Sequence, residues 1–135
     1  MNRNNFIEQT ANAARRAYQF SVKSRKEGLA GLEDDIDTEA LKRGDVFEFG
    51  MRFALEGAGF EQVDGILSGM IGREKNEYAM RLKTIQKEAV ICIQRGDYLF
   101  ILLNIIFSFL NDDEKKEARV LLEKDSVFKE YFNFY

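Results

Sequence analysis

Hydrophobic positions recur every three to four residues along most of this chain, which is the period of an amphipathic α-helix. The first such stretch runs from about Asn5 to Glu27 and carries its arginine and lysine residues on the opposite face. Leu29, Leu32 and Ile36 keep the same spacing. The pattern therefore predicts that this helix continues through Gly28, with a weak point there because glycine costs about 1 kcal/mol relative to alanine.

Two further helices are expected in the middle of the chain. The second helix should run from Glu39 to about Glu56, capped by Asp37 or Thr38, and residues 57–59 should form a turn. The third should begin near Phe60 and extend to Arg95. Glycines at 69 and 72 weaken this long helix, so the pattern also allows two shorter ones.

The stretch from Tyr98 to Leu110 is apolar almost all round, and it follows a C-cap and N-cap pair at Gly96-Asp97. A helix of this kind must be covered on most sides, either by the core or by a second copy of the chain. Its apolar run, Leu99–Leu110, has twelve residues, whereas a membrane-spanning helix needs about 20. We therefore expect no direct membrane span.

Two short helices should close the chain, the first from Asp112 to Lys124 behind an Asn111 cap and the second after a Ser126 cap. No segment alternates with the period of a β-strand, and the sequence contains no proline, which breaks helices. The expected fold class is all-α, as a single-domain helical bundle of about five to six helices with one long helix. Residues 1–88 and residues 89–135, the latter with the apolar helix and the tail helices, form its two parts.

Composition removes several classes of function. The 135 residues are 45% hydrophobic and 32% charged, as in soluble globular domains, and the net charge of −3 disfavours nucleic acid as a partner. Histidine, the commonest general base and metal ligand, is absent, and the single cysteine, Cys92, lies on an apolar helix face that is expected to be buried. The N-terminus lacks the apolar region of a secretory signal, so we expect a cytoplasmic protein.

Motifs for catalysis or cofactor binding are not found. The carboxylates at 33–35 are interpreted as a solvated acidic face, and those at 112–114 as partners of a helix dipole. The glycines match neither a phosphate-binding loop nor a dinucleotide fingerprint, and residues 34–45 lack the EF-hand glycine and terminal glutamate. We therefore expect no enzyme, no catalytic residue, no cofactor and no metal.

The remaining candidate for a functional surface is the charged stretch, Lys23–Ile36, which reads KSRKEGLAGLEDDI. Its charge changes sign along the chain, which is suited to a partner that carries two opposite charges. The expected partner-binding residues are three basic and three acidic ones: Lys23, Arg25, Lys26, Glu33, Asp34 and Asp35.

The charged stretch resembles the cytoplasmic part of the MotA family of ion-driven flagellar stator subunits, in the MotA/TolQ/ExbB proton-channel superfamily. Members typically read A-[KR]-x-R-[KR]-x-G-[LM]-x-x-L-E-x-[ED]-[IL] after their second membrane helix. The residues in register are Arg25, Gly28, Leu29, Leu32, Glu33, Asp35 and Ile36, and further along Phe47, Gly57, Val63, Ile66 and Leu67. The resemblance covers Ala14 to Leu67, and more loosely Ala89 to Leu110.

The resemblance implies a rotor-facing cytoplasmic domain without the family's third and fourth membrane helices, so this chain alone would conduct no ions. In the family, an arginine and a glutamate eight residues apart contact oppositely charged side chains of the rotor protein FliG. Arg25 and Glu33 stand at those positions. On a continuous helix both charges would fall on one broad face. The implied function is a non-enzymatic protein–protein interaction module of a flagellar motor, acting in motility.

An alternative follows from the apolar helix. If a second copy of the chain covers Leu99–Leu110, the protein is a homodimer or larger homo-oligomer that serves as a helical scaffold or adaptor. The charged stretch would then only keep the protein soluble.

Overall fold

The computed structural model describes all 135 residues and consists of eight α-helices and one 3₁₀-helix, without any strand. The predicted all-α class is confirmed. The expected number of five to six helices is too low, because each of the three helices expected before Gly96 is interrupted.

The first interruption falls at Gly28. Helix α1 (Arg3–Glu27) begins behind Asn2, whose side chain accepts a hydrogen bond from the Asn5 N–H, and it ends where Gly28 adopts a φ of 77°. The chain then forms the 3₁₀-helix η1 (Leu29–Asp35). The predicted continuation of the first helix is therefore wrong. A straight helix would carry Leu32 away from the core, whereas the turn brings this side chain back and buries it completely.

The second interruption falls at Gly44, which has a φ of 83° and separates α2 (Thr38–Lys42) from α3 (Val46–Leu55). The predicted continuous helix from Glu39 to Glu56 is thus two helices. The predicted cap is confirmed, because the Asp37 carboxylate accepts a hydrogen bond of 3.0 Å from the Ala40 N–H. Asp45 caps α3 in the same way through the Glu48 N–H, also at 3.0 Å.

The long third helix is divided as the alternative prediction allowed. Helix α4 (Phe60–Ile71) ends at Gly72, and α5 (Glu77–Arg95) begins behind Asn76, whose side chain accepts a hydrogen bond from the Ala79 N–H. Helix α5 ends at Gly96 in the left-handed conformation, as predicted.

Three short helices complete the chain: α6 (Leu99–Phe107), α7 (Asp112–Leu122) and α8 (Ser126–Phe134). The predicted Asn111 cap is confirmed, with a capping box in which Asn111 and Glu114 exchange hydrogen bonds. Two other cap predictions are off by one residue, because Tyr98 and not Asp97 precedes α6, and Asp125 and not Ser126 precedes α8.

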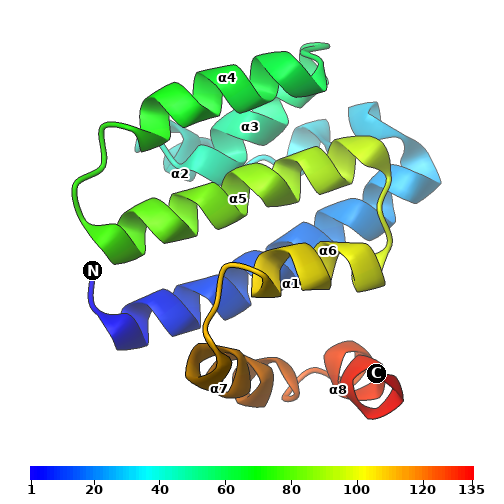
Figure 1. Ribbon diagram of the computed structural model, residues 1–135. Coiled ribbons are helices and arrows are strands. Elements are labelled where there is room, and N and C mark those ends of the chain that lie inside the picture. Colours follow the sequence, from blue (N-terminus) through cyan, green and yellow to red (C-terminus); the bar gives the residue numbers. More distant parts are fainter.

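Figure 1 shows α1 and α5 side by side through the middle of the molecule, with α3 and α4 on one side and α6, α7 and α8 on the other. Helix α5 packs against α1, α3, α4 and α6, and α7 packs against α1. The buried apolar side chains form one contiguous cluster that includes residues of every α-helix except the short α2. The boundary expected at residues 88 and 89 lies inside α5.

Crossing a bilayer requires a helix with both sufficient length and sufficient apolarity, and none of the helices combines the two.

Candidate functional site

The charged stretch is folded back on itself around Gly28. Lys23 on α1 and Asp35 in η1 form an ion pair, with 2.7 Å between Nζ and Oδ2, and this hydrogen bond raises the pKa of Lys23. Two of the six expected partner-binding residues therefore neutralise each other within the chain. The expectation that the stretch presents one helical face is wrong, since the α-helix ends at Gly28.

Arg25 makes its contacts with other residues of the same chain. Its guanidinium donates hydrogen bonds to the Ser21 hydroxyl and, at 2.9 Å, to the Asp97 carbonyl, and it lies 4.1 Å from the ring centroid of Tyr98. These contacts tie α1 to the turn between α5 and α6. Replacement of Arg25 would thus disturb the fold as well as any partner contact.

The other three expected partner-binding residues are exposed, and none of their side chains forms an ion pair or a hydrogen bond: Lys26, Glu33 and Asp34. Lys26 lies in the last turn of α1, while the two acids lie in η1. They are the part of the predicted site that is free to meet a partner.

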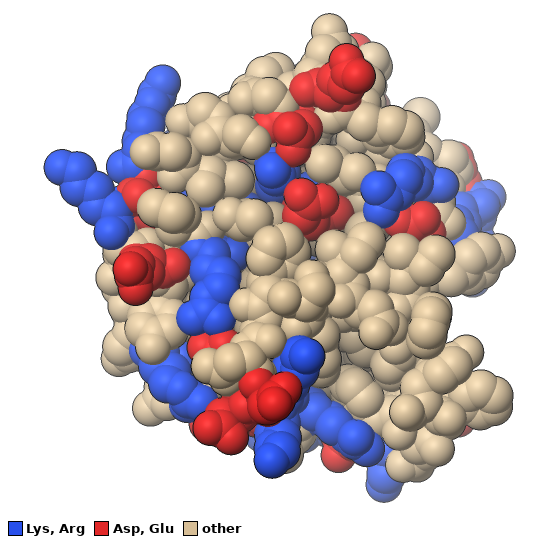
Figure 2. All heavy atoms as spheres, in the orientation of Figure 1, with Lys and Arg blue, Asp and Glu red and all other residues tan.

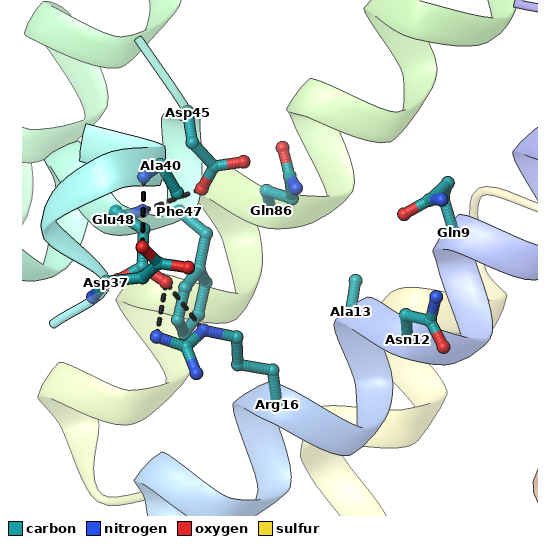
Figure 3. Close-up of a pocket in the computed structure, with 10 residues that line it drawn as sticks. All are labelled: Gln9, Asn12, Ala13, Arg16, Asp37, Ala40, Asp45, Phe47, Glu48 and Gln86. Carbon is teal, nitrogen blue, oxygen red and sulfur yellow. Dashed lines mark hydrogen bonds and ion pairs between the residues drawn. The ribbon is translucent and has the colours of Figure 1, made fainter. Parts of the chain in front are cut away.

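A polar cavity of about 230 Å³ lies between α1, α3 and α5 (Figure 3). On its wall Arg16 of α1 binds Glu48 of α3, with 2.6 Å between Nε and Oε1, and Arg16 stacks 4.6 Å from the centroid of Phe20. Only 3% of the Glu48 side chain is exposed, and burial raises the pKa of Glu48 despite the ion pair with Arg16. The Asp37 N–H donates to the second oxygen of Glu48 at 3.3 Å.

Every acidic group on this wall has a structural role. Asp37 and Asp45 cap α2 and α3, and Glu48 holds α1 and α3 together through Arg16 (Figure 3). A general acid or base would need a carboxylate that is free to exchange a proton with a substrate. No group of three Cys, Asp or Glu side chains could hold a metal ion. We therefore interpret the polar side chains of this cavity as structural, with the Arg16–Glu48 ion pair joining α1 to α3.

Sequence reasoning missed Glu48, because a charged side chain is rarely expected in a core. The buried residues of α3 include Phe47, Glu48 and Met51, whereas Phe49 and Phe53 are half-buried and pack against the core. An acidic residue flanked by Phe47 and Phe49 was the only available signal.

A second internal ion pair joins α5 to α7. Arg81 binds Glu114 in two places, with 2.6 Å to Oε1 and 3.0 Å to Oε2, and also donates to the Phe109 carbonyl at 3.1 Å. Its guanidinium lies 4.3 Å from the centroid of Phe6. Burial alone would raise the pKa of Glu114, but hydrogen bonds from Arg81 and from the Asn111 N–H outweigh it and hold that pKa below its ordinary value.

The apolar helix α6 is only half covered. Leu102, Leu103 and Ile106 enter the core, whereas the opposite side of α6 remains in water. Together with the end of α8 it forms what we call the aromatic surface, whose residues are between 47% and 80% exposed: Tyr98, Phe100, Ile101, Phe134 and Tyr135. Figure 2 shows a broad area without charged side chains over α6 and α8, with charges around its edge.

Helix α8 lies against α6 through ring contacts. Phe100 and Tyr135 have their ring centroids 4.8 Å apart, and Phe107 and Phe132 have theirs 5.9 Å apart. Between the two helices remains an open groove of about 320 Å³, bordered mainly by these rings. The sequence analysis offered residues 99–110 as an interface only as the alternative to core burial, and it did not place α8 beside them. The density of Phe and Tyr after Ser126 was the available signal.

No family model, no curated protein and no solved structure matches this chain, so the relationship to the MotA family stays a prediction.

Proposed function

We propose that this protein is a non-enzymatic, helical interaction module that associates with a second copy of itself through the aromatic surface. The observation that carries the proposal is the exposure of five large, uncharged side chains at α6 and at the end of α8, where Tyr135 contacts both Phe100 and Phe134. Single exposed apolar residues are common on folded proteins, whereas a contiguous exposed apolar patch typically marks a binding surface.

The size of the aromatic surface supports a stable contact. Because a Phe or Tyr side chain presents about 150–250 Å², the exposed fractions leave about 600 Å² of apolar surface in water. The largest apolar patch of a typical monomer is about 300–600 Å². A standard interface removes about 800 Å² per partner, so the aromatic surface would supply the centre of such an interface and its polar surroundings the rim.

The chemistry of the surface favours a second copy as the partner. In a two-fold dimer the same patch meets itself, so the patch must be compatible with its own residues. Aromatic and aliphatic side chains satisfy this condition, and the absence of charge at the centre means that no like charges are buried opposite each other. Aromatic residues are also the type most enriched in the centres of protein interfaces.

Light scattering and sedimentation velocity over a wide concentration range test the proposal. We expect a dimer that dissociates on dilution, and a monomer for the variant Ile101→Glu/Phe134→Glu, since the interface would then bury two charges per copy. Val120→Glu is the matched control, because Val120 is an equally exposed apolar residue on α7, outside the aromatic surface. A wild-type protein that stays monomeric at every concentration would refute self-association.

A second candidate function rests on the three unpaired charges of the charged stretch. The MotA resemblance implies Arg25 and Glu33 as the contacts with the rotor protein FliG. Of these two, Glu33 is exposed, and Lys26 and Asp34 beside it are also free to contact a partner of opposite charge. Exposed charge pairs contribute roughly 0–1 kcal/mol each, so this docking would be weak and sensitive to salt.

Titration of the protein against FliG at low and high salt tests this second candidate. The variant Lys26→Glu/Glu33→Lys should abolish a salt-sensitive interaction while leaving the helical circular-dichroism signal unchanged, because neither residue contacts the core. Binding that is equal for the variant and the wild type would remove the charged stretch as the contact.

A further inference from the structure

Helix α8 is a short helix beside α6, and only one of its side chains, Phe128, is fully buried. Phe128 is buried and lies edge-on to Tyr18 of α1, with the ring centroids 5.7 Å apart. On the side of α6, the Asn104 amide donates a hydrogen bond of 3.0 Å to the Tyr131 hydroxyl, and Phe132 stacks near Phe107. We call the surface of α1 and α6 that receives these side chains the α8 groove.

We propose that two copies exchange their α8 helices, so that α8 of each copy fills the α8 groove of the other. This inference rests on the proposed self-association and specifies how the dimer is built. The α8 helix itself shows what the groove binds: a short amphipathic helix with aromatic residues on one face.

The attachment of α8 to its own copy is limited. Phe128 is the only side chain of α8 that is fully buried, and the groove of about 320 Å³ between α6 and α8 shows that their rings do not fill the space between them. Helix α8 follows α7 after only three residues, Glu123 to Asp125, and Arg15 holds this connection through a 2.6 Å hydrogen bond from Nε to Asp125. Detachment of α8 from its own copy would thus expose one buried side chain, Phe128, and break a few ring contacts and a few polar contacts.

The contacts that α8 loses when it leaves its own copy are regained in the exchanged dimer, because each of them forms again with the identical α8 groove of the other copy. The connection of three residues spans at most about 10 Å when extended, which forces the two copies into contact. The residues brought together in this way are those around the groove, including the half-exposed Phe100 of the aromatic surface. The exchanged dimer therefore buries surface that the closed monomer leaves in water, and this additional burial favours it at high protein concentration.

Cross-linking between two different full-length chains tests the exchange. One chain carries Asn104→Cys and a size tag, the other carries Tyr131→Cys, and the two are refolded together and treated with a short bis-maleimide. The native Cys92 does not interfere, because it is buried and burial raises the pKa of its thiol to about 12. We expect a covalent heterodimer, since position 131 of one chain lies beside position 104 of the other.

Two further variants separate exchange from simple surface contact. A single chain with both cysteines reports whether α8 lies in the groove of the same copy, because it then forms a cross-link without becoming a dimer. Insertion of Gly-Ser-Gly-Ser after Lys124 relaxes the connection between α7 and α8, so the two copies of an exchanged dimer are no longer forced together. We expect this insertion to lower the dimer fraction at least several-fold, whereas a dimer of closed copies would be unaffected.

The outcomes distinguish this inference from the proposed function. A wild-type dimer with no cross-chain adduct, whose association does not change on lengthening the connection, would overturn the exchange and leave self-association through the aromatic surface intact. A wild-type monomer would overturn both.

Discussion

The ion pair between Arg81 and Glu114, which joins α7 to α5, offers a sharp test of how α7 is held to the rest of the fold. Only 2% of the Glu114 side chain is exposed, and Arg81 supplies both of its charged hydrogen bonds. The variant Arg81→Met keeps a long side chain over Phe6 but removes the charge. The Glu114 carboxylate would then be buried with only the Asn111 N–H as donor.

The expected cost follows from the burial of Glu114. Removing one partner of a buried ion pair typically costs about 3–5 kcal/mol, because the remaining charge is uncompensated. A domain of this size has a total stability of roughly 5–15 kcal/mol, so the variant should remain folded but lose a large part of it. Since 1 kcal/mol corresponds to roughly 3–5 °C, the Tm should fall by about 10–20 °C.

The double variant Arg81→Met/Glu114→Leu distinguishes an uncompensated charge from lost packing. Replacing both partners by apolar residues is often near neutral, so the double variant should be more stable than Arg81→Met alone, apart from about 1 kcal/mol for the lost capping box. Arg52→Met is the control, because Arg52 pairs with Glu56 on the exposed face of α3 and should cost less than 1 kcal/mol.

Urea denaturation followed by circular dichroism measures these free energies of unfolding. The destabilisation of Arg81→Met should also shrink at acidic pH, because without Arg81 burial raises the pKa of Glu114 and the folded state takes up its proton first. A loss below 1 kcal/mol for Arg81→Met, or a double variant less stable than the single one, would refute the reasoning.

Two further outcomes are expected. Hydrogen bonds from the Asn76 N–H and from Lys83 lower the pKa of Glu74 from 4.5 to about 2. Ionised Glu74 therefore stabilises the fold above pH 4.5, and this contribution is lost as the pH falls towards 2. In pH-dependent thermal melts, Glu74→Gln should be less stable than the wild type at pH 7 and equal to it near pH 2. Gly50→Ala should destabilise the protein by roughly 1–3 kcal/mol in urea denaturation, because the new methyl group would lie 2.7 Å from a side-chain atom of Val90 in α5. Gly65→Ala, on the open face of α4, should instead stabilise the protein by about 0.5–1 kcal/mol. Equal effects of the two variants would contradict the packing of α3 on α5.

Local interactions explain what could be predicted from the sequence. The all-α class, the turn at residues 57–59 and the caps at Asp37, Asn111 and Gly96 all depend on neighbours within a few residues. Helical periodicity and capping hydrogen bonds are properties of a short segment, so a segment read alone is enough to recognise them.

Packing decided the helix breaks and the ion pairs. Gly28 and Gly44 could each have continued a helix at modest cost, but the turns bring Leu32 and α3 back onto the core and bury more apolar surface than a straight helix would. Arg16 and Glu48 are 32 residues apart, and Arg81 and Glu114 are 33 apart. No local pattern links such pairs.

The two candidate surfaces were also only partly predictable from the sequence. The sequence alone marked the charged stretch by its change of sign and Leu99–Leu110 by its apolar length, because charge and hydrophobicity are properties of single residues. Only the tertiary structure decided that Lys23 and Arg25 are occupied within the chain, and that α6 leaves Phe100 and Ile101 in water beside α8. Exposure and pairing depend on what the rest of the chain places next to a residue, and that is set by the packing of helices distant in sequence.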